Sequence, residues 1–298
     1  MRARDLFLVL LVVALWGMNF VVIKIGLKEM SPLSLCFARF FFTSIPAVFF
    51  VKRPNVPFSS VASYGLIMFA LQFSLLFIGL NIGMPAGLAS VLLQTNVFFT
   101  LLLAIFFLNE RPRKWQLLGA FISFSGIAMI GMHVGGDMTL AGFLLVIAAA
   151  FFWGLGSLIS KKMGKVGGLS LVVWGSLVAW PPLLLVAIVT EGGARVISDF
   201  SYISFSEGFS ISYIVIFSTL IGFALWNRLL LRYPIALVAP FTLLVPVFGL
   251  LSSSLVLGEV LTHLQILSIL LIVSGLIINL TVSKLTATKV LTPAEESL

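Results

Sequence analysis

Long apolar runs separated by short polar breaks dominate this sequence from end to end. A helix needs about 20 predominantly apolar residues to cross a bilayer, and ten runs reach roughly that length. With 60% hydrophobic and 9% charged residues, the chain is far too apolar for a soluble domain, where charged residues make up about 25%. We therefore predict an all-α membrane protein with ten transmembrane helices, over residues 6–27, 31–51, 62–83, 85–108, 115–132, 139–160, 168–189, 210–231, 235–257 and 262–283.

The basic residues predict the orientation of the chain. A net charge of +8 would suit a nucleic-acid ligand, but Lys and Arg cluster in every second loop, which is the pattern of the positive-inside rule. The opposite loops hold only Lys28 and Arg195. We expect both termini to be cytoplasmic and no nucleic acid to be a partner. The clustered residues are Arg2, Arg4, Lys52, Arg53, Arg111, Arg113, Lys114, Lys161, Lys162, Lys165, Arg228, Arg232, Lys284 and Lys289.

The two halves of the chain share motifs at fixed offsets. Trp16-Gly17 followed by Lys24 recurs as Trp153-Gly154 followed by Lys161, an offset of 137 residues. Later residues recur at an offset of 149 residues. The loop from Thr190 to Phe209 accommodates the 12-residue difference between the two offsets. The second set is Tyr64, Pro85, Leu88, Phe99, Leu108, Glu110, Gln116, Ser125 and Gly126, matched by Tyr213, Pro234, Leu237, Phe248, Leu257, Glu259, Gln265, Ser274 and Gly275.

These offsets predict an inverted repeat. Each half holds five predicted spans, and because five is odd the second half enters the membrane from the opposite side. We expect one repeat over residues 1–133, an inverted second repeat over 134–283 and a cytoplasmic tail over 284–298. Inverted repeats are typical of secondary transporters, whose halves rock around a site near the midplane. A channel or a receptor for a small solute is the alternative, and saturable flux with counter-transport would favour a carrier.

Several motifs resemble one known family. They are WGMNFVVIKIG over 16–26, ARF over 38–40, MPAGLAS over 84–90, Trp153-Gly154, and the LNE and LGE that end the fourth and ninth runs. Over nearly the whole chain these residues resemble the EamA family of the drug/metabolite transporter superfamily, and within it the bacterial O-acetylserine/cysteine exporter type. The resemblance implies a multi-pass carrier in the bacterial inner membrane that exports amino acids or related small metabolites.

Arg39 is the charge that we place deepest in the membrane. It lies eight residues into the second span, about 12 Å below the outer boundary at about 1.5 Å per residue. An arginine at the centre of a membrane helix costs about 2.5 to 3.5 kcal/mol, and no Asp or Glu lies inside any predicted span. Its planar guanidinium suits a substrate carboxylate. The alternative is structural, with Arg39 binding backbone carbonyls and water between two helices.

Polar side chains near the midplane are further candidates. A substrate site in spans one, three and four would explain them, whereas the alternative is helix-to-helix hydrogen bonding worth about 0.6 to 2 kcal/mol per bond. Gln94 is the preferred ligand contact, because Asn96 lies on a nearly opposite helix face. The polar residues of the first half are Asn19, Gln72, Gln94, Thr95 and Asn96, matched in the second half by Gly156, Ile221, Leu243, Leu244 and Val245.

Aromatic rings complete the candidate substrate-binding set. Trp16, Trp153 and Tyr213 present ring faces that suit an ammonium group. The alternative is bulky packing where the halves meet. The candidate substrate-binding residues are thus Arg39, Gln94, Asn96, Gln72, Asn19, Trp16, Trp153 and Tyr213.

Residues near the ends of the spans carry structural expectations. Lys24 is expected to extend toward the outer interface. Glu110 and Glu259 are expected to cap the helices that directly follow them. We expect Pro234, Pro240 and Pro246 to interrupt the ninth span, and residues 190–209 to be a solvated connection.

The sequence gives no sign of an enzyme. It has no H-E-x-x-H motif, no Walker loop and no Asp or Glu within a predicted span, and His133 and His263 are expected near the outer surface, so neither metal-assisted proteolysis nor ATP hydrolysis has its required groups. We expect no metal and no cofactor. The expected partners are a small-molecule substrate and the lipid bilayer, and a homodimer stays open.

Overall fold

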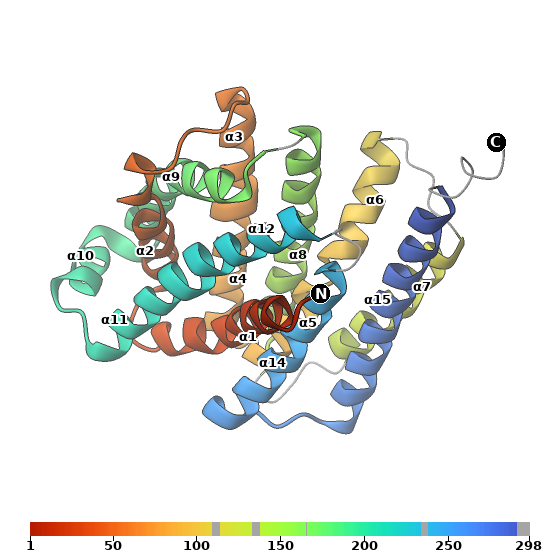
Figure 1. The fold of residues 1–298 in the computed structure, drawn as a ribbon. Helices are drawn as coiled ribbons and strands as arrows, with labels where there is room; N and C mark the ends of the chain where they lie inside the picture. Colours follow the sequence, from red (N-terminus) through yellow and green to blue (C-terminus); the bar gives the residue numbers. More distant parts are fainter. Residues whose placement is uncertain (109–113, 133–137, 165, 234–237, 291–298) are drawn as a thin grey trace.

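The computed structural model describes residues 1–108, 114–132, 138–164, 166–233 and 238–290, and within these ranges it is helical with no strand (Figure 1). Several spans change helix type along their length, which gives more elements than spans. The first half contains α1 (Ala3–Gly26), α2 (Pro32–Ser44), η1 (Ala47–Phe49), α3 (Phe58–Tyr64), η2 (Gly65–Leu71), α4 (Gln72–Asn81), α5 (Ala86–Leu93), α6 (Asn96–Leu108) and α7 (Lys114–Met132). The second half contains α8 (Leu140–Lys162), α9 (Gly168–Ala187), η3 (Ile188–Gly192), α10 (Gly193–Ser201), α11 (Phe205–Ser212), η4 (Tyr213–Ile221), α12 (Gly222–Arg232), η5 (Ala239–Leu243), α14 (Leu244–Ser252), η6 (Ser253–Leu257) and α15 (His263–Val290).

Eight helical stretches are long and apolar enough to cross a membrane. They coincide with the first eight predicted spans. Two shorter apolar helices, Phe241–Leu257 and His263–Ile278, lie where the ninth and tenth spans were predicted. The eight are Ala3–Gly26, Pro32–Phe49, Phe58–Asn81, Ala86–Phe107, Lys114–Met132, Leu140–Lys162, Gly168–Ser201 and Phe205–Arg232.

Residues 190–209, expected to be a solvated connection, are mostly exposed, but they are largely helical and anchored to the rest of the bundle. The span that begins with α9 continues through η3 and α10 to Ser201, and α11 begins at Phe205. Asp199 is buried, and both it and Glu191 accept hydrogen bonds from Ser31. Glu191 also accepts from the backbone N–H of Leu33 in the first turn of α2. The segment is therefore a packed helical cap on the loop between α1 and α2.

The fourth span is broken at its centre. α5 ends at Leu93 and α6 begins at Asn96. The side chains of Thr95 and Asn96 donate to the carbonyls of Leu92 and Leu93, at 2.6 and 2.7 Å. Such local bonds compete with the α-helical ladder. The ninth span contains the 3-10 helix η5, which holds Pro240 and agrees with the interruption expected there. Pro246 lies inside the α-helix α14, and Pro234 lies outside the described residues.

Glycine contacts recur between the halves. A Cβ atom added to Gly17 of α1 would lie 2.5 Å from Cβ of Phe248 in α14. A Cβ atom added to Gly154 of α8 would lie 3.0 Å from Cβ of Phe99 in α6. Small residues let membrane helices approach closely, so each Trp-Gly motif fixes one tight helix crossing.

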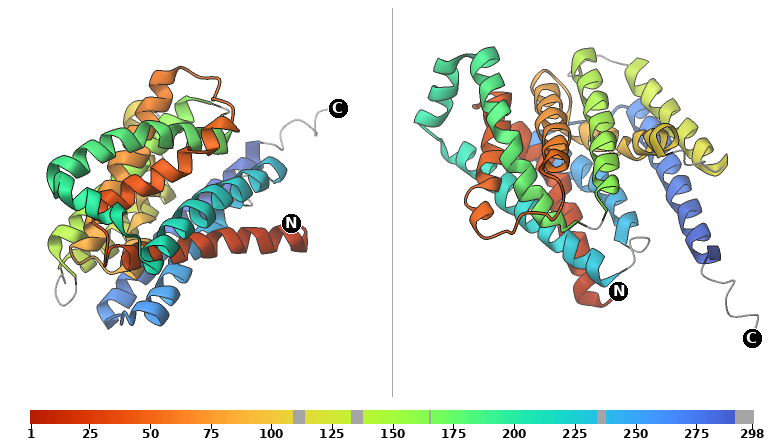
Figure 2. Two further views of the ribbon diagram at one scale, coloured as in Figure 1. Left: turned by 90° about the vertical axis from the view of Figure 1, so that its left-hand side faces the viewer. Right: turned by 90° about the horizontal axis from the view of Figure 1, so that it is seen from above.

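The helices surround α1. In Figure 1, α7 and α15 lie side by side at the right-hand edge, α10 and α11 lie at the left, and α1 passes between them. The view from above in Figure 2 shows the same separation of α10 from α7 and α15. Because α1 contacts α5, α12, η4 and α14, both halves of the chain meet along it.

Candidate functional site

A cavity of about 120 Å³ lies at the meeting of the two halves. Helices α1, α2, α4 and α5 line it from the first half, and α8, η4, α12, η5 and α14 from the second. Most of the wall is aromatic or aliphatic. Its residues are Trp16, Asn19, Phe20, Arg39, Phe73, Leu76, Leu93, Gln94, Trp153, Ser218, Phe223, Thr242 and Val245.

Arg39 carries the charge of this cavity. It is 4% exposed, and its guanidinium carbon lies 4.2 Å from the centroid of the Phe73 ring. Its Nε and Nη1 atoms are buried without a hydrogen-bond partner. Unpaired buried donors cost free energy, and more so when they are charged. The ring stabilises the cation from one side.

Asn19 and Gln94 add the amide groups of the cavity. Asn19 is buried, and its Oδ1 atom has no hydrogen-bond partner. Gln94, which follows α5 at the break in the fourth span, donates from Nε2 to the carbonyl of Thr242 at 2.8 Å. Gln94 thus ties the broken fourth span to η5 of the ninth span, whereas Asn19 Oδ1 is a buried acceptor without a partner.

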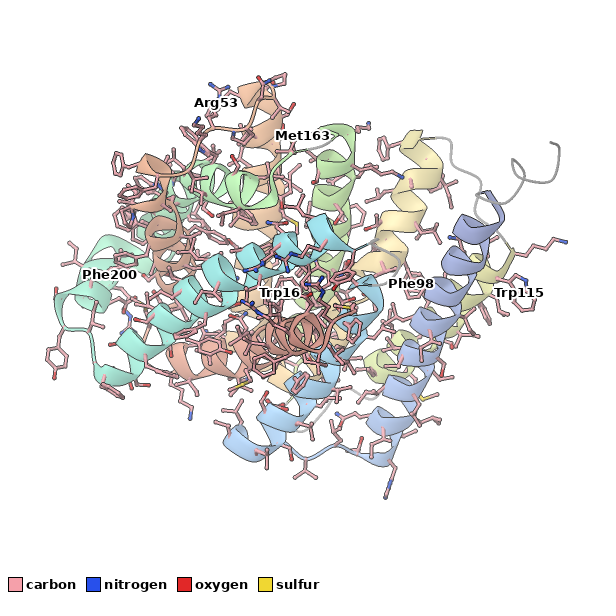
Figure 3. All side chains as sticks on the ribbon, in the orientation of Figure 1. Trp16, Arg53, Phe98, Trp115, Met163 and Phe200 are labelled. Atoms are coloured by element: carbon pink, nitrogen blue, oxygen red, sulfur yellow. The ribbon has the colours of Figure 1, made fainter. Side chains whose placement is uncertain are left out.

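Trp16 and Trp153 both line the cavity, as the sequence predicted. Trp16 donates from Nε1 to the carbonyl of Ser218 at 3.0 Å, and its ring packs on Phe223 and Trp226 at centroid distances of 5.4 and 5.2 Å. Figure 3 shows Trp16 in the middle of the bundle, where α1 passes α12. Trp115 lies at the outer edge of the molecule and is exposed.

Three predicted site residues lie outside the cavity wall. Asn96 donates to the carbonyl of Leu93 within its own segment. Tyr213 donates its hydroxyl to the carbonyl of Leu15 at 3.0 Å and packs against Phe217. Gln72 is fully buried, and neither its Oε1 nor its Nε2 atom has a partner. The structure brings the other five together, namely Arg39, Asn19, Gln94, Trp16 and Trp153.

Sequence reasoning predicted Trp153 but missed the other second-half residues of the cavity wall. Ser218 and Thr242 line the cavity and present carbonyl groups that accept from Trp16 and Gln94. Ser218 lies in the π-helix η4, and Thr242 lies in the 3-10 helix η5. The prolines of the ninth span were the available signal for η5, whereas the sequence carries no comparable signal for η4.

Lys24 and Glu259 bind backbone groups at the same end of the bundle. Lys24 donates from Nζ to the carbonyls of Leu80 and Met84, at 3.0 and 2.7 Å, just before α5, and its extension toward the outer interface stays a prediction. Glu259 was expected to cap the helix that follows it, and instead accepts from the N–H groups of Ala86 and Gly87 at 2.7 and 2.9 Å. Its carboxylate therefore caps α5, a helix of the other half. Glu110 lies outside the described residues.

A second set of contacts lies at the other end of α1. Asp5 is buried, accepts from the Tyr233 hydroxyl at 2.8 Å and pairs with Arg232 at 3.4 Å. Lys24 and Asp5 lie near opposite ends of α1, about 28 Å apart at about 1.5 Å per residue. Polar contacts between the halves thus lie at both ends of the bundle, with the cavity between them.

The sequence matches the EamA-like transporter family twice, over residues 4–132 and over residues 140–281. The chain belongs to the EamA-like transporter family. Among its relatives it is 41% identical to a protein of Salmonella typhimurium and to one of Escherichia coli, each named "Probable amino-acid metabolite efflux pump". Each match covers 94% of this chain and 95% of the relative. This EamA-like transporter is also 28% identical to an uncharacterized transporter of Bacillus subtilis, over 95% of this chain and 93% of that relative.

The fold of this EamA-like transporter has a solved counterpart. A structure named "Crystal structure of protein" has a TM-score of 0.63 and 18% sequence identity to it, and the match covers 98% of this chain and 100% of that one. At this identity the likeness concerns the fold alone. The family assignment confirms the resemblance read from the motifs and makes the protein a multi-pass membrane transporter.

Proposed function

We propose that this protein is a secondary transporter that exports amino acids or related small metabolites across the bacterial inner membrane by alternating access. The observation that carries the proposal is the cavity between the halves, in which Arg39 holds two buried, unpartnered nitrogen atoms. A charged group in that position calls for an anionic ligand. The names of the Salmonella and Escherichia coli relatives support amino-acid metabolites as the cargo.

Ten spans in two inverted repeats form the architecture of the proposal. The repeats cover residues 1–133 and 134–283, and a cytoplasmic tail covers 284–298. Two observations support this division. The family matches the chain once in each half, and the tight contacts of Gly17 with Phe248 and of Gly154 with Phe99 join equivalent residues of the two halves.

Both termini are cytoplasmic in this proposal. The support comes from the basic residues, because Arg53 and Met163, which directly follows Lys161 and Lys162, lie at the same end of the bundle (Figure 3). By the positive-inside rule this end faces the cytoplasm. The end that holds Glu259 and the N-terminus of α5 then faces outward.

Within the cavity, Arg39 binds the substrate carboxylate, and Asn19, Gln94, Trp16 and Trp153 complete the contact surface. Gln72, Asn96 and Tyr213 support the helices around it. For alternating access, the contacts of Asp5 with Arg232 and Tyr233 separate to open the cytoplasmic side. The contact of Glu259 with α5 separates to open the outer side.

The test is counterflow of radiolabelled amino acids and close metabolites into proteoliposomes that contain wild type or Arg39→Gln. We expect saturable, counterflow-stimulated flux of at least one solute in wild type and its loss in Arg39→Gln. Arg53→Gln is the matched control, because Arg53 is exposed and lies over a Phe58 ring at 5.3 Å. Flux that neither saturates nor responds to counter-substrate would indicate a channel. Equal flux in wild type and Arg39→Gln would make Arg39 structural.

A further inference from the structure

A second pocket lies between the start of α9 and the end of α12, and its described wall shares no residue with the cavity between the halves. Its volume is about 580 Å³, within the range of about 300–1,000 Å³ that is usual for ligand pockets. In the first turns of α9, Ser170 donates its hydroxyl to the carbonyl of Lys52, and Trp174 donates to that of Val51 at 3.0 Å. The pocket therefore lies beside Arg53, at the end of the bundle that carries the basic residues.

Two arginines give this pocket a positive charge. Arg228 and Arg232 are four residues apart on α12, so their side chains are neighbours on one helix face and repel each other. In the described part of the chain, the wall holds no acidic side chain and Arg228 has no ion pair or hydrogen bond. Arg232 contacts Asp5 through one nitrogen at 3.4 Å, and its side chain is 46% exposed. An anion between the two guanidinium groups would remove their repulsion.

The start of α9 adds further donors to the pocket. The first N–H groups of a helix have no partner within it, and the residue before α9 is Gly167, which has no side chain to cap them. Among the residues that the structure describes, none accepts from the N–H groups of Gly168, Leu169 or Ser170. Asn227 also lines the pocket, and its unpartnered Nδ2 atom lies 2.5 Å from the position of a Cβ atom added to Gly168. Such a set of donors suits a phosphate group.

The remainder of the wall is largely apolar. Leu231 is 89% exposed, and Val166, Leu169 and Leu230 line the same pocket. A water-soluble phosphate would leave these side chains in contact with water, whereas acyl chains would cover them. Basic pockets between membrane helices on the cytoplasmic side bind the headgroups of anionic lipids. A phosphate joined to acyl chains thus matches both the charged and the apolar part of this wall.

We propose that this pocket binds an anionic phospholipid from the surrounding leaflet. Arg228 and Arg232 bind the phosphate, the start of α9 donates backbone N–H groups to it, and Leu231 contacts an acyl chain. Because Arg232 also pairs with Asp5 of α1, the lipid phosphate and the Asp5 carboxylate share one guanidinium. The site is separate from the solute cavity, so the inference does not depend on what the protein transports.

The experiment measures lipid binding to the purified full-length protein in detergent by native mass spectrometry. The dissociation constant of the first bound lipid is compared for phosphatidylglycerol, which is anionic, and for phosphatidylcholine with the same acyl chains, which has no net charge. We expect tighter binding of phosphatidylglycerol to wild type. Equal binding of the two lipids would overturn the proposal.

Single arginine variants locate the binding site. Arg228→Gln is expected to weaken phosphatidylglycerol binding about fivefold, which is about the contribution of one basic residue near a membrane surface. Arg228→Lys keeps the charge and should retain the preference for phosphatidylglycerol. Arg53→Gln is the matched control, because Arg53 is exposed, lies at the same end of the bundle and does not line this pocket. Equal effects of Arg228→Gln and Arg53→Gln would overturn the assignment to this pocket.

The apolar part of the wall separates a lipid from a soluble phosphate. Inorganic phosphate and glycerol phosphate, at the concentration of the lipid, are expected to leave phosphatidylglycerol bound. Leu231→Ser should weaken phosphatidylglycerol binding, whereas Leu255→Ser should not, because Leu255 is 84% exposed and lies outside the pocket. Displacement of the lipid by equimolar inorganic phosphate would indicate a phosphate site and overturn the lipid assignment.

Asp5→Asn tests the sharing of Arg232. The substitution removes the carboxylate charge that competes for the guanidinium, so we expect tighter binding of phosphatidylglycerol than in wild type. Such a gain does not arise from misfolding, and unchanged or weaker binding would overturn the sharing. Counterflow in proteoliposomes is scored separately. Loss of counterflow with intact lipid selectivity would count against the transport function alone, and loss of lipid selectivity with intact counterflow would count against this inference alone.

Discussion

At the scale of single residues, the cavity combines one cation with a supporting ring. The Phe73 ring lies beneath the guanidinium of Arg39 at 4.2 Å, and a desolvated cation–π contact is worth about 2 kcal/mol. The ring therefore holds the guanidinium in place, while its Nε and Nη1 atoms are buried without a hydrogen-bond partner. The position of the charge depends on this aromatic contact as much as on the arginine.

Phe73→Leu tests this dependence. We expect the variant to keep its fold and to bind substrate about tenfold more weakly. Without the cation–π contact to Phe73, the guanidinium is no longer held in its binding position before the ligand arrives. The measurement is binding of the solute that shows counterflow to purified protein, with the elution profile as a check of folding. Phe58→Leu, beneath the exposed Arg53, is the control and should leave binding unchanged. Equal binding by the two variants would show that Arg39 is positioned by other contacts.

At the scale of helices, close crossings depend on residues without side chains. A Cβ atom added to Gly17 of α1 would lie 2.5 Å from Cβ of Phe248 and 2.7 Å from the carbonyl oxygen of Val245. A Cβ atom on Gly208 of α11 would lie 3.7 Å from Ile203, which is an ordinary contact. The two glycines thus differ in how much the neighbouring helix must move.

Gly17→Ala should therefore destabilise the protein, whereas Gly208→Ala should not. Overpacking a close contact costs about 1–3 kcal/mol, and the separation of α1 from α14 would also widen the cavity that both helices line. We expect a lower midpoint of thermal unfolding in detergent for Gly17→Ala and no fall for Gly208→Ala. Equal unfolding midpoints for Gly17→Ala and wild type would mean that α14 moves away from α1 without loss of stability.

The contact between the Glu259 carboxylate and the start of α5 leads to a second prediction about helix packing. Charge-assisted hydrogen bonds contribute about 1.5–3 kcal/mol, and Glu259→Ala removes two of them. Glu259→Gln keeps one acceptor oxygen, so we expect it to lie between wild type and Glu259→Ala in thermal stability. Equal thermal stability of wild type, Glu259→Gln and Glu259→Ala would show that this contact does not hold the halves together.

At the scale of the whole molecule, polar contacts close the bundle at both ends of α1. The chain has a single cysteine, Cys36, which is buried, so Cys36→Ala gives a cysteine-free background. In that background Asn19→Cys places a thiol in the cavity. Labelling by a membrane-impermeant maleimide then reports which side the cavity faces.

Alternating access predicts opposite effects of weakening the two ends. Glu259→Ala should raise labelling of the introduced cysteine from the outer face, and Asp5→Ala should raise it from the cytoplasmic face. The measurement uses vesicles of defined orientation, with the unaltered Asn19→Cys protein as the reference. Parallel changes on both faces would contradict alternating access and favour an open pore.

Sequence reasoning located eight spans and five members of the cavity because both follow from local patterns. Apolar runs mark spans, and a polar residue in a run marks an inward-facing side chain, as Asn19, Arg39 and Gln94 show. It also preferred Gln94 to Asn96 from their helix faces, and Gln94 lines the cavity whereas Asn96 bonds to Leu93 within its own segment. The break in the span between Leu93 and Asn96 was not predicted. Glu259 and Asp199 were misjudged because their partners, α5 and Ser31, are distant in sequence.

The second half meets the cavity partly through its backbone, and this affects how selectivity can change over generations. The groups that accept from Trp16 and Gln94 are the carbonyls of Ser218 and Thr242, which every amino acid possesses. A point mutation there replaces the side chain and leaves the carbonyl. Arg39 and Asn19 act through side chains and lie in the first half. Mutations at Ser218 and Thr242 therefore leave these two hydrogen bonds available, whereas mutations at Arg39 and Asn19 remove the polar groups themselves.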